Sequence, residues 1–81
     1  MNERILLKGY LAEVRKLYKE KDLEASGLLV SIRTLLNPYE DDMTKIDTEK
    51  ALIMMKKLHE CIQELKALKE RMAKLEQDLN G

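Results

Sequence analysis

The triplet His59-Glu60-Cys61 contains the side chains in this chain that are best suited to chemistry. A cysteine nucleophile needs a histidine base within hydrogen-bond reach and a third group that orients the base. Residues two apart on a helix point to different sides, so His59 and Cys61 do not face each other in a helical segment. The zinc-binding pattern HExxH is absent. We therefore expect a small buried thiol and a solvated imidazole here, and no catalytic residue.

The acidic stretch of residues 40–47 is the other group with chemical potential, because closely spaced carboxylates can bind calcium. An EF-hand loop places its ligands at alternating positions, with a central glycine and a closing glutamate. Met43 and Lys45 fall at ligand positions, and the stretch has no glycine. Cys61 is the only cysteine, which excludes an internal disulfide and a cysteine-based metal site. The sequence predicts an exposed acidic turn, with no metal site and no cofactor.

The length and composition are those of a small helical protein. The 81 residues form one domain at most, and a chain this short buries only about 60% of its unfolded surface. Charged residues make up 37% of the chain, which has three glycines, one proline and no Phe or Trp. This composition is typical of long helices and coiled coils. Because the chain lacks disulfides and metal ligands, we expect self-association to complete its core.

Residues 3–36 have the periodicity of a first helix. Lys21 is the one polar residue in its seam, and Gly27 lies in its weakest part, which leaves a continuous helix and a break near Ser26-Gly27 as alternatives. We favour the continuous helix and interpret Gly27 as a point of close helix–helix approach. The apolar seam recurs at coiled-coil spacing and consists of Leu7, Leu11, Val14, Tyr18, Ala25, Leu28, Ile32 and Leu35.

Residues 37–47 predict a turn, and residues 48–79 predict a second helix. Pro38 disfavours helical conformation at Asn37, and Asp47 can cap the second helix by accepting from its free backbone N–H groups. The second seam continues over four heptads without a slip and consists of Ala51, Met54, Leu58, Cys61, Leu65, Leu68, Met72, Leu75 and Leu79.

Two helices of similar length joined by a turn predict an all-α fold, with residues 1–81 forming a single, long antiparallel helical hairpin of coiled-coil type. Folding back at the turn brings Lys21 near Glu60 and Glu64, and we expect Lys21 to reach one of them. The apolar stripe is wider than a two-stranded seam requires, so we expect two hairpins to dimerise into a four-helix bundle. The predicted interface consists of Leu28, Leu29, Ile32, Leu35, Leu36, Leu52, Met55, Leu58, Ile62 and Leu65.

Charge is uneven along the chain although its net value is zero. Residues 22–49 carry seven acidic and two basic side chains, so the hairpin would have an acidic tip and a mildly basic open end. Zero net charge argues against a dedicated nucleic-acid binder. If the open end does contact nucleic acid, the residues involved would be Lys8, Arg15, Lys16, Lys19, Lys69 and Arg71. No apolar run reaches the length of a membrane span, and the N-terminus does not read as a signal peptide, so we expect a cytoplasmic protein.

Three segments resemble small uncharacterised proteins that are encoded in the early regions of Mu-like prophages, in which a helix ends in an Arg-Leu-Leu-Asn/Asp-Pro-aromatic run before a second helix. The segments are Leu7-Lys8-Gly9-Tyr10-Leu11-Ala12-Glu13, Ile32-Arg33-Thr34-Leu35-Leu36-Asn37-Pro38-Tyr39 and Asp47-Thr48-Glu49-Lys50-Ala51. The resemblance covers nearly the whole chain. It implies a phage or prophage origin and a bacterial cytoplasmic location, and it brings no catalytic residues.

The functional expectation is a non-enzymatic interaction module, such as a small phage or prophage regulator or adaptor that acts through coiled-coil contacts. Its partner would be a second copy of itself, or another helical protein. The alternative is a nucleic-acid-associated protein that uses the basic open end. The sequence leaves open the biological process, the identity of a partner, and the number and orientation of chains in an oligomer.

Overall fold

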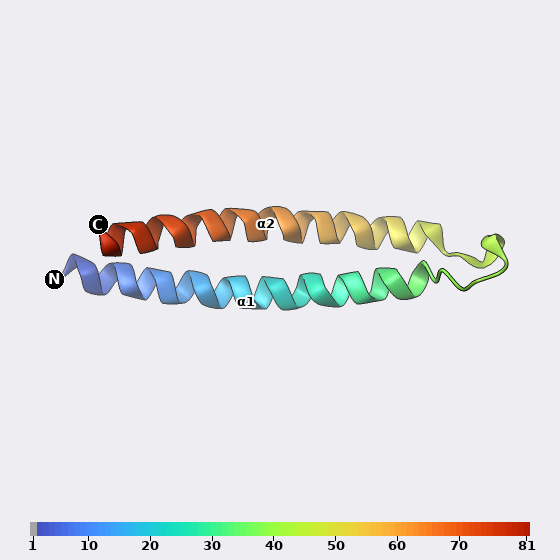
Figure 1. Cartoon of the computed structure of the whole chain (residues 1–81), viewed down its shortest axis with the longest axis horizontal. Helices are drawn as coiled ribbons and strands as arrows, with labels where there is room; N and C mark the ends of the chain where they lie inside the picture. The colour runs from blue at the N-terminus through green and yellow to red at the C-terminus, as the bar shows by residue number, and fades with distance from the viewer. Residues whose placement is uncertain (1) are drawn as a thin grey trace.

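The computed structural model describes residues 2–81 and consists of two long helices that lie antiparallel, side by side (Figure 1). Helix α1 spans Glu3–Leu35 and helix α2 spans Thr48–Asn80, with 33 residues each. The molecule is a rod of 63 × 17 × 14 Å, and residues 2–81 contain no strand. The predicted all-α hairpin is therefore confirmed, and its helix boundaries differ from the predicted ones by one residue at the end of each helix.

Helix α1 is continuous through Ser26-Gly27, as predicted. At its start, the Asn2 side chain accepts a hydrogen bond from the backbone N–H of Arg4 at 2.9 Å. The interpretation of Gly27 as a close helix–helix approach is wrong, because a Cβ built there meets no atom within 4 Å. The same is true of Gly9. Both glycines therefore face open space and have no packing role.

The turn between the helices is held by polar side chains. The Asn37 side chain accepts from the Tyr39 N–H at 3.0 Å, and the Asp42 carboxylate accepts from the Thr44 N–H at 3.0 Å and from its hydroxyl at 2.7 Å. A short 3-10 helix, η1, spans Met43–Lys45 and follows this cap. The 3-10 helix η1 was not predicted, because the acidic residues of the turn were expected to be solvated.

The helix ends beside the turn match the sequence signals. Helix α1 ends at Leu35, and Leu36 occupies its C-cap, two residues before Pro38. At the start of α2, the Asp47 side chain accepts from the Lys50 N–H at 3.0 Å, which confirms the predicted N-cap. These two ends fix the length of the turn between the helices, and so the register in which the helices meet.

The core is a thin line of side chains along the seam. Within residues 2–81, no side chain falls below 2% exposure. One cluster, formed by Ala25, Ile32, Leu58 and Cys61, receives the partly buried Leu28, Met54 and Leu65. The buried set as a whole is Leu11, Val14, Ala25, Ile32, Ala51, Leu58 and Cys61.

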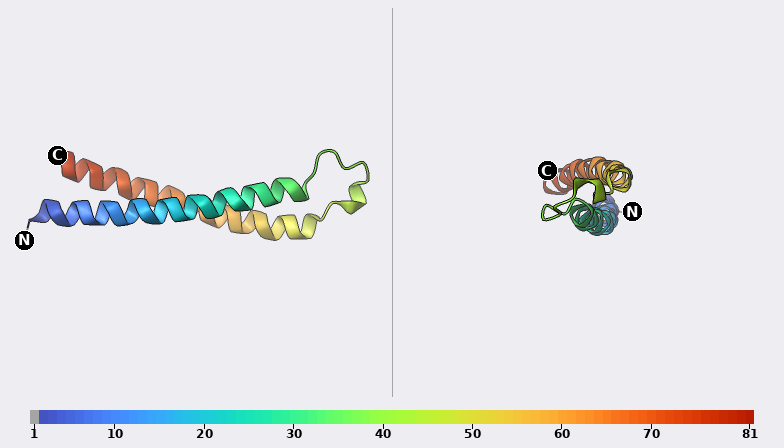
Figure 2. Two further views of the ribbon diagram at one scale, coloured as in Figure 1. Left: turned by 90° about the horizontal axis from the view of Figure 1, so that it is seen from below. Right: turned by 90° about the vertical axis from the view of Figure 1, so that its right-hand side faces the viewer.

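The rod shape leaves a large surface for the size of the chain. The view turned by 90° shows that the two helices cross each other along the rod (Figure 2), as coiled-coil packing requires. The accessible surface is 6720 Å², whereas a compact protein of this mass exposes about 5,000 Å². The hairpin therefore exposes roughly a third more surface than a compact monomer would.

Candidate functional site

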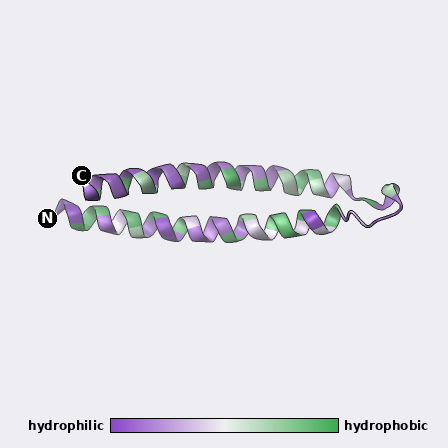
Figure 3. Cartoon of the chain, in the orientation of Figure 1, coloured by the Kyte–Doolittle hydropathy of each residue, from purple (hydrophilic) through white to green (hydrophobic). Residues whose placement is uncertain are grey.

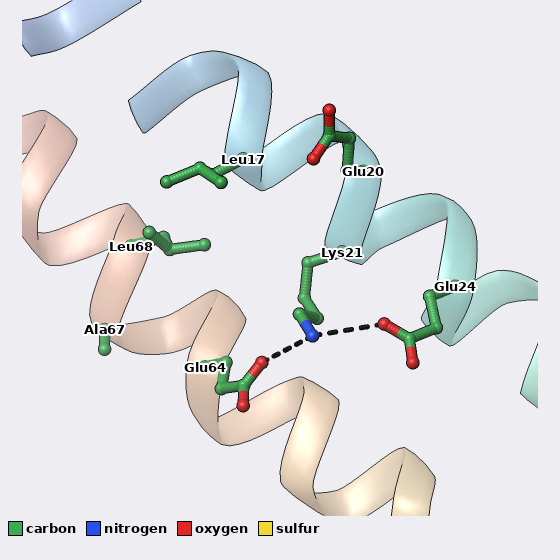
Figure 4. A pocket seen from close by; sticks show the side chains of 7 residues that line it. All are labelled: Leu17, Glu20, Lys21, Glu24, Glu64, Ala67 and Leu68. Atoms are coloured by element: carbon green, nitrogen blue, oxygen red, sulfur yellow. Dashed lines mark ion pairs between the residues drawn. The ribbon is translucent and has the colours of Figure 1, made fainter. Parts of the chain in front are cut away.

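Lys21 forms two ion pairs, one that links it to α2 and one within α1 (Figure 4). Its Nζ lies 2.7 Å from Glu64 Oε2 on α2 and 3.1 Å from Glu24 Oε2 on α1. The predicted pairing of Lys21 is confirmed, and of the two predicted partners, Glu60 and Glu64, it is Glu64 that Lys21 contacts. The hydrogen bond that Lys21 donates to Glu64, followed by the one that it donates to Glu24, raises the pKa of Lys21 above its ordinary value. Lys21 therefore stays charged at neutral pH and marks the register of the two helices.

An open groove of about 500 Å³ lies beside this network. Figure 4 shows Leu17 and Leu68 near each other on facing helices, and the carboxylates of Glu24 and Glu64 on either side of the lysine. The lining is made of aliphatic and charged side chains and contains no His, Cys, Ser or Thr. Its cation is already paired with two carboxylates. The complete lining is Leu17, Glu20, Lys21, Glu24, Glu64, Ala67 and Leu68.

The structure separates His59 from Cys61. His59 is exposed, whereas Cys61 is only 5% exposed and lies in the cluster between the helices. Burial raises the pKa of the Cys61 thiol, which disfavours the nucleophilic thiolate. The two side chains therefore do not form a nucleophile–base pair.

The carboxylates of the turn serve the backbone. The Thr44 hydroxyl, followed by its backbone N–H, lowers the pKa of Asp42. Glu40 accepts from the Asp42 N–H at 3.2 Å. Over the part of the chain that the structure describes, no three His, Cys, Asp or Glu side chains come together as metal ligands would. Asp42 and Glu40 therefore act as caps for a tight turn.

One flank of the seam carries a row of residues that changes character along the rod. It begins with the ion pair between Arg15 Nη2 and Glu76 Oε1, at 3.1 Å. Arg15 and Glu76 each directly follow a seam residue of their own helix. Residues seven apart lie on the same side of a coiled-coil helix, so steps of seven from Arg15 and from Glu76 give the other members of the row. We call this row the Arg15 face; it consists of Arg15, Asp22, Leu29 and Leu36 from α1 and its C-cap, and of Met55, Ile62, Lys69 and Glu76 from α2.

The residues of the Arg15 face differ between the two halves of the rod. We call residues 25–65, which include the turn, the tip half, and residues 2–24 with 66–81 the open half. In the tip half the face is apolar and exposed, with Leu29 at 48%, Met55 at 46% and Ile62 at 38% exposure. Leu36, Met55 and the neighbouring Leu52 also line a hollow of about 180 Å³. Figure 3 shows the same change along α2, which is mainly hydrophilic near its C-terminus and more hydrophobic towards the turn.

The predicted interface residues fall into two groups. Ile32 and Leu58 are buried between α1 and α2 of one chain, at 3% and 7% exposure. They belong to the core of the hairpin and are not free to contact a partner, which corrects their assignment. Leu28, Leu35 and Leu65 are half-buried in the seam, and the exposed remainder consists of Leu29, Leu36, Leu52, Met55 and Ile62.

The predicted basic residues are exposed and do not share one side of the rod. Arg15 is already paired with Glu76. By their heptad positions, Lys8 and Lys69 lie on the flank of Arg15, Arg71 lies on the opposite flank, and Lys16 lies on the outer surface of α1. The open end therefore offers scattered cations and no continuous basic stripe.

Two charged contacts were not predicted from the sequence. Glu24 was not singled out, although a lysine and a glutamate three residues apart on a helix are neighbours. Arg15 was placed among the candidate phosphate contacts, and Glu76 was not recognised as its partner. The heptad repeat contained this signal, because both residues directly follow a seam position.

Within residues 2–81, neither helix contains an apolar stretch long enough to cross a membrane. Comparisons of the chain with protein-family models, with curated proteins and with solved structures give no match. The case for a function therefore rests on the surface of the hairpin itself.

Proposed function

We propose that this chain is a non-enzymatic helical interaction module that self-associates into a four-helix bundle. The observation that carries the proposal is the exposed apolar part of the Arg15 face in the tip half, together with Leu52. Leu52 is 70% exposed beside Leu36, which is 42% exposed. Leaving such side chains in water forgoes about 25 cal/mol for each Å² of apolar surface that a partner would cover.

The thin core supports the same proposal. A chain of 81 residues without a disulfide is marginal as a lone domain. Its accessible surface of 6720 Å² exceeds that of a compact monomer. A second copy on the tip half would deepen the core at the place where the apolar stripe is widest.

The biological setting belongs to the proposal as well. The resemblance to proteins from early regions of Mu-like prophages favours a small regulator or adaptor of phage or prophage origin. The proposed location is the bacterial cytoplasm. A single free thiol such as Cys61 stays reduced in that compartment, so it fits this location.

The experiment is a molar-mass measurement by size exclusion with light scattering at several concentrations. The proposal predicts twice the chain mass of 9.5 kDa. A folded monomer of 9.5 kDa at high concentration would contradict it. The same samples test nucleic-acid association, the alternative function, for which tight DNA binding that weakens steeply with rising salt would be the signature.

A further inference from the structure

We propose that two hairpins pair through their Arg15 faces with both turns at the same end of the bundle. This inference rests on the proposed self-association and adds its surface and its orientation. The occupant of the apolar tip half is a second copy of this chain, related to the first by a twofold axis parallel to the rod. In that arrangement α1 of one chain lies beside α2 of the other at the same height.

The apolar part of the face supports this pairing. Within one hairpin, Leu29 lies at the same height along the rod as Ile62, and Leu36 lies at the same height as Met55. An axis parallel to the rod keeps these heights, so it places Leu29 of each chain near Ile62 of the other, and Leu36 near Met55. All four side chains are between 38% and 48% exposed in the single chain. The tip half thus gains apolar contacts on both sides of the axis.

The charged part of the face fits the same axis. Arg15 pairs with Glu76 within one chain at 3.1 Å. The axis brings Arg15 of one chain near Glu76 of the other, and Asp22 near Lys69, so unlike charges meet in each layer. The face is therefore complementary to itself along its whole length.

The opposite flank of the seam lacks this property. There Glu24 and Glu64 of one chain already share Lys21. The same symmetry applied to this flank would place Glu24 of each chain beside Glu64 of the other, and in each chain Lys21 is the cation that contacts these two carboxylates. Like-charge repulsion therefore selects the Arg15 face.

The reversed orientation is also disfavoured on the Arg15 face. A twofold axis perpendicular to the rod would lay the apolar Leu29 and Leu36 over the charged open half of the partner. If the two tip halves alone overlapped in that orientation, the open halves would gain no contact. Only the arrangement with both turns at one end covers apolar residues with apolar ones in the tip half and brings unlike charges together in the open half.

The available area is sufficient for a stable dimer. The surface in excess of a compact monomer is roughly 1,700 Å² per chain, and a standard interface needs about 800 Å² from each partner.

The orientation is tested by distances between spin labels in the intact chain. Cys61→Ala removes the native thiol and keeps a small apolar residue in the core. One variant, Glu3→Cys, carries the label at the open end. The other, Tyr39→Cys, carries it in the turn, where the Tyr39 side chain is 89% exposed. Helicity by circular dichroism and molar mass confirm that each labelled chain is folded and associated.

The inference predicts label–label distances below about 40 Å at both sites, since neighbouring helix axes lie about 10 Å apart. A dimer with either distance above about 40 Å overturns the orientation and leaves the proposed self-association standing. Reversed arrangements give this result, because a helix of 33 residues is about 50 Å long. A folded monomer overturns the orientation and the proposed function together.

Discussion

The two halves of the hairpin contain the same seam and differ in the residues beside it. In the open half the flanking positions of the Arg15 face are charged, and Arg15 and Glu76 neutralise each other. In the tip half the equivalent positions are Leu29 and Ile62, which remain 48% and 38% exposed. A seam with charged flanks is complete with two helices, whereas a seam with an apolar flank needs more than one partner helix. The width of the apolar stripe is therefore the basis for the proposed position of a second hairpin.

The core follows the same division. The cluster of Ala25, Ile32, Leu58 and Cys61 lies in the tip half. In the open half, Leu11 and Val14 of α1 are the buried residues. The tip half is thus both the better packed part of one chain and the part with the largest unpaired apolar surface.

The largest effect is expected from a charge in the apolar part of the face. Ile62→Glu should raise the dissociation constant of the dimer at least about 100-fold, because an unpaired buried carboxylate costs several kcal/mol. Sedimentation equilibrium measures this change.

The matched control is Ile53→Glu, which places the same charge in α2 away from the Arg15 face, at a residue that is 61% exposed. It should change the dissociation constant by less than about threefold. Equal effects of the two variants would show that the Arg15 face has no special role.

The two exposed glycines give the next largest effect. Gly27→Ala in the tip half and Gly9→Ala in the open half should each raise the free energy of unfolding by about 1 kcal/mol, since alanine favours a helix and the new Cβ meets open space. Urea unfolding measures both values. A loss of stability for Gly27→Ala alone would mean that a partner helix approaches Gly27 closely, in contrast to the arrangement proposed here.

Lys21→Leu tests whether the polar residue at the boundary between the halves limits the apolar stripe. Since the lysine side chain is 31% exposed, the substitution should stabilise the helices by roughly 0.5–1 kcal/mol and add species larger than a dimer. Lys16→Leu, on the outer surface of α1, is the control for added hydrophobicity. If the Lys21→Leu protein has unchanged stability and molar mass, Lys21 sets neither the register of the helices nor the number of chains in the oligomer.

Arg15→Ala should have a much smaller effect than Ile62→Glu. Its ion pair with Glu76 joins side chains that are 57% and 49% exposed. Exposed pairs contribute about 0.2–1 kcal/mol, and salt screens them. Thermal unfolding at low and high salt measures the loss, and a decrease of several kcal/mol would show that the open half is more deeply buried than this structure indicates.

The smallest effect is expected at the turn, from the protonation of Asp42. Because the folded chain lowers the pKa of this carboxylate, its contribution to stability is present above the ordinary value of 3.8 and is lost as the pH falls through the lowered pKa. Amide exchange of the Thr44 N–H should therefore accelerate in acid. Asp42→Asn, which cannot ionise, should make that exchange independent of pH after correction for the intrinsic exchange rate.

The helices were predictable because their seams obey the heptad repeat and their ends carry Pro38 and Asp47. The Lys21–Glu64 contact was predictable for the same reason, since folding at the turn fixes the register. The turn itself was not predicted in detail. The hydrogen bonds between Asp42 and Thr44 depend on local backbone geometry, whereas the prediction for the turn rested only on the charge of its acidic residues.

The exposed apolar surface was predictable in its location and less so in its members. Ile32 and Leu58 have the residue types of an interface, but a seam residue can face its own partner helix or another chain. Periodicity alone does not separate these two roles. The distinction requires the position of α2, which buries Ile32 and leaves Leu29 outside.

The most direct test of the account is an isotope-filtered NMR experiment on a mixture of labelled and unlabelled chains, which detects contacts between chains only. The account predicts intermolecular cross-peaks between the methyl groups of Leu29 and Ile62. The absence of intermolecular cross-peaks from these methyl groups at concentrations well above the dissociation constant would contradict the claim that a second hairpin covers the tip half.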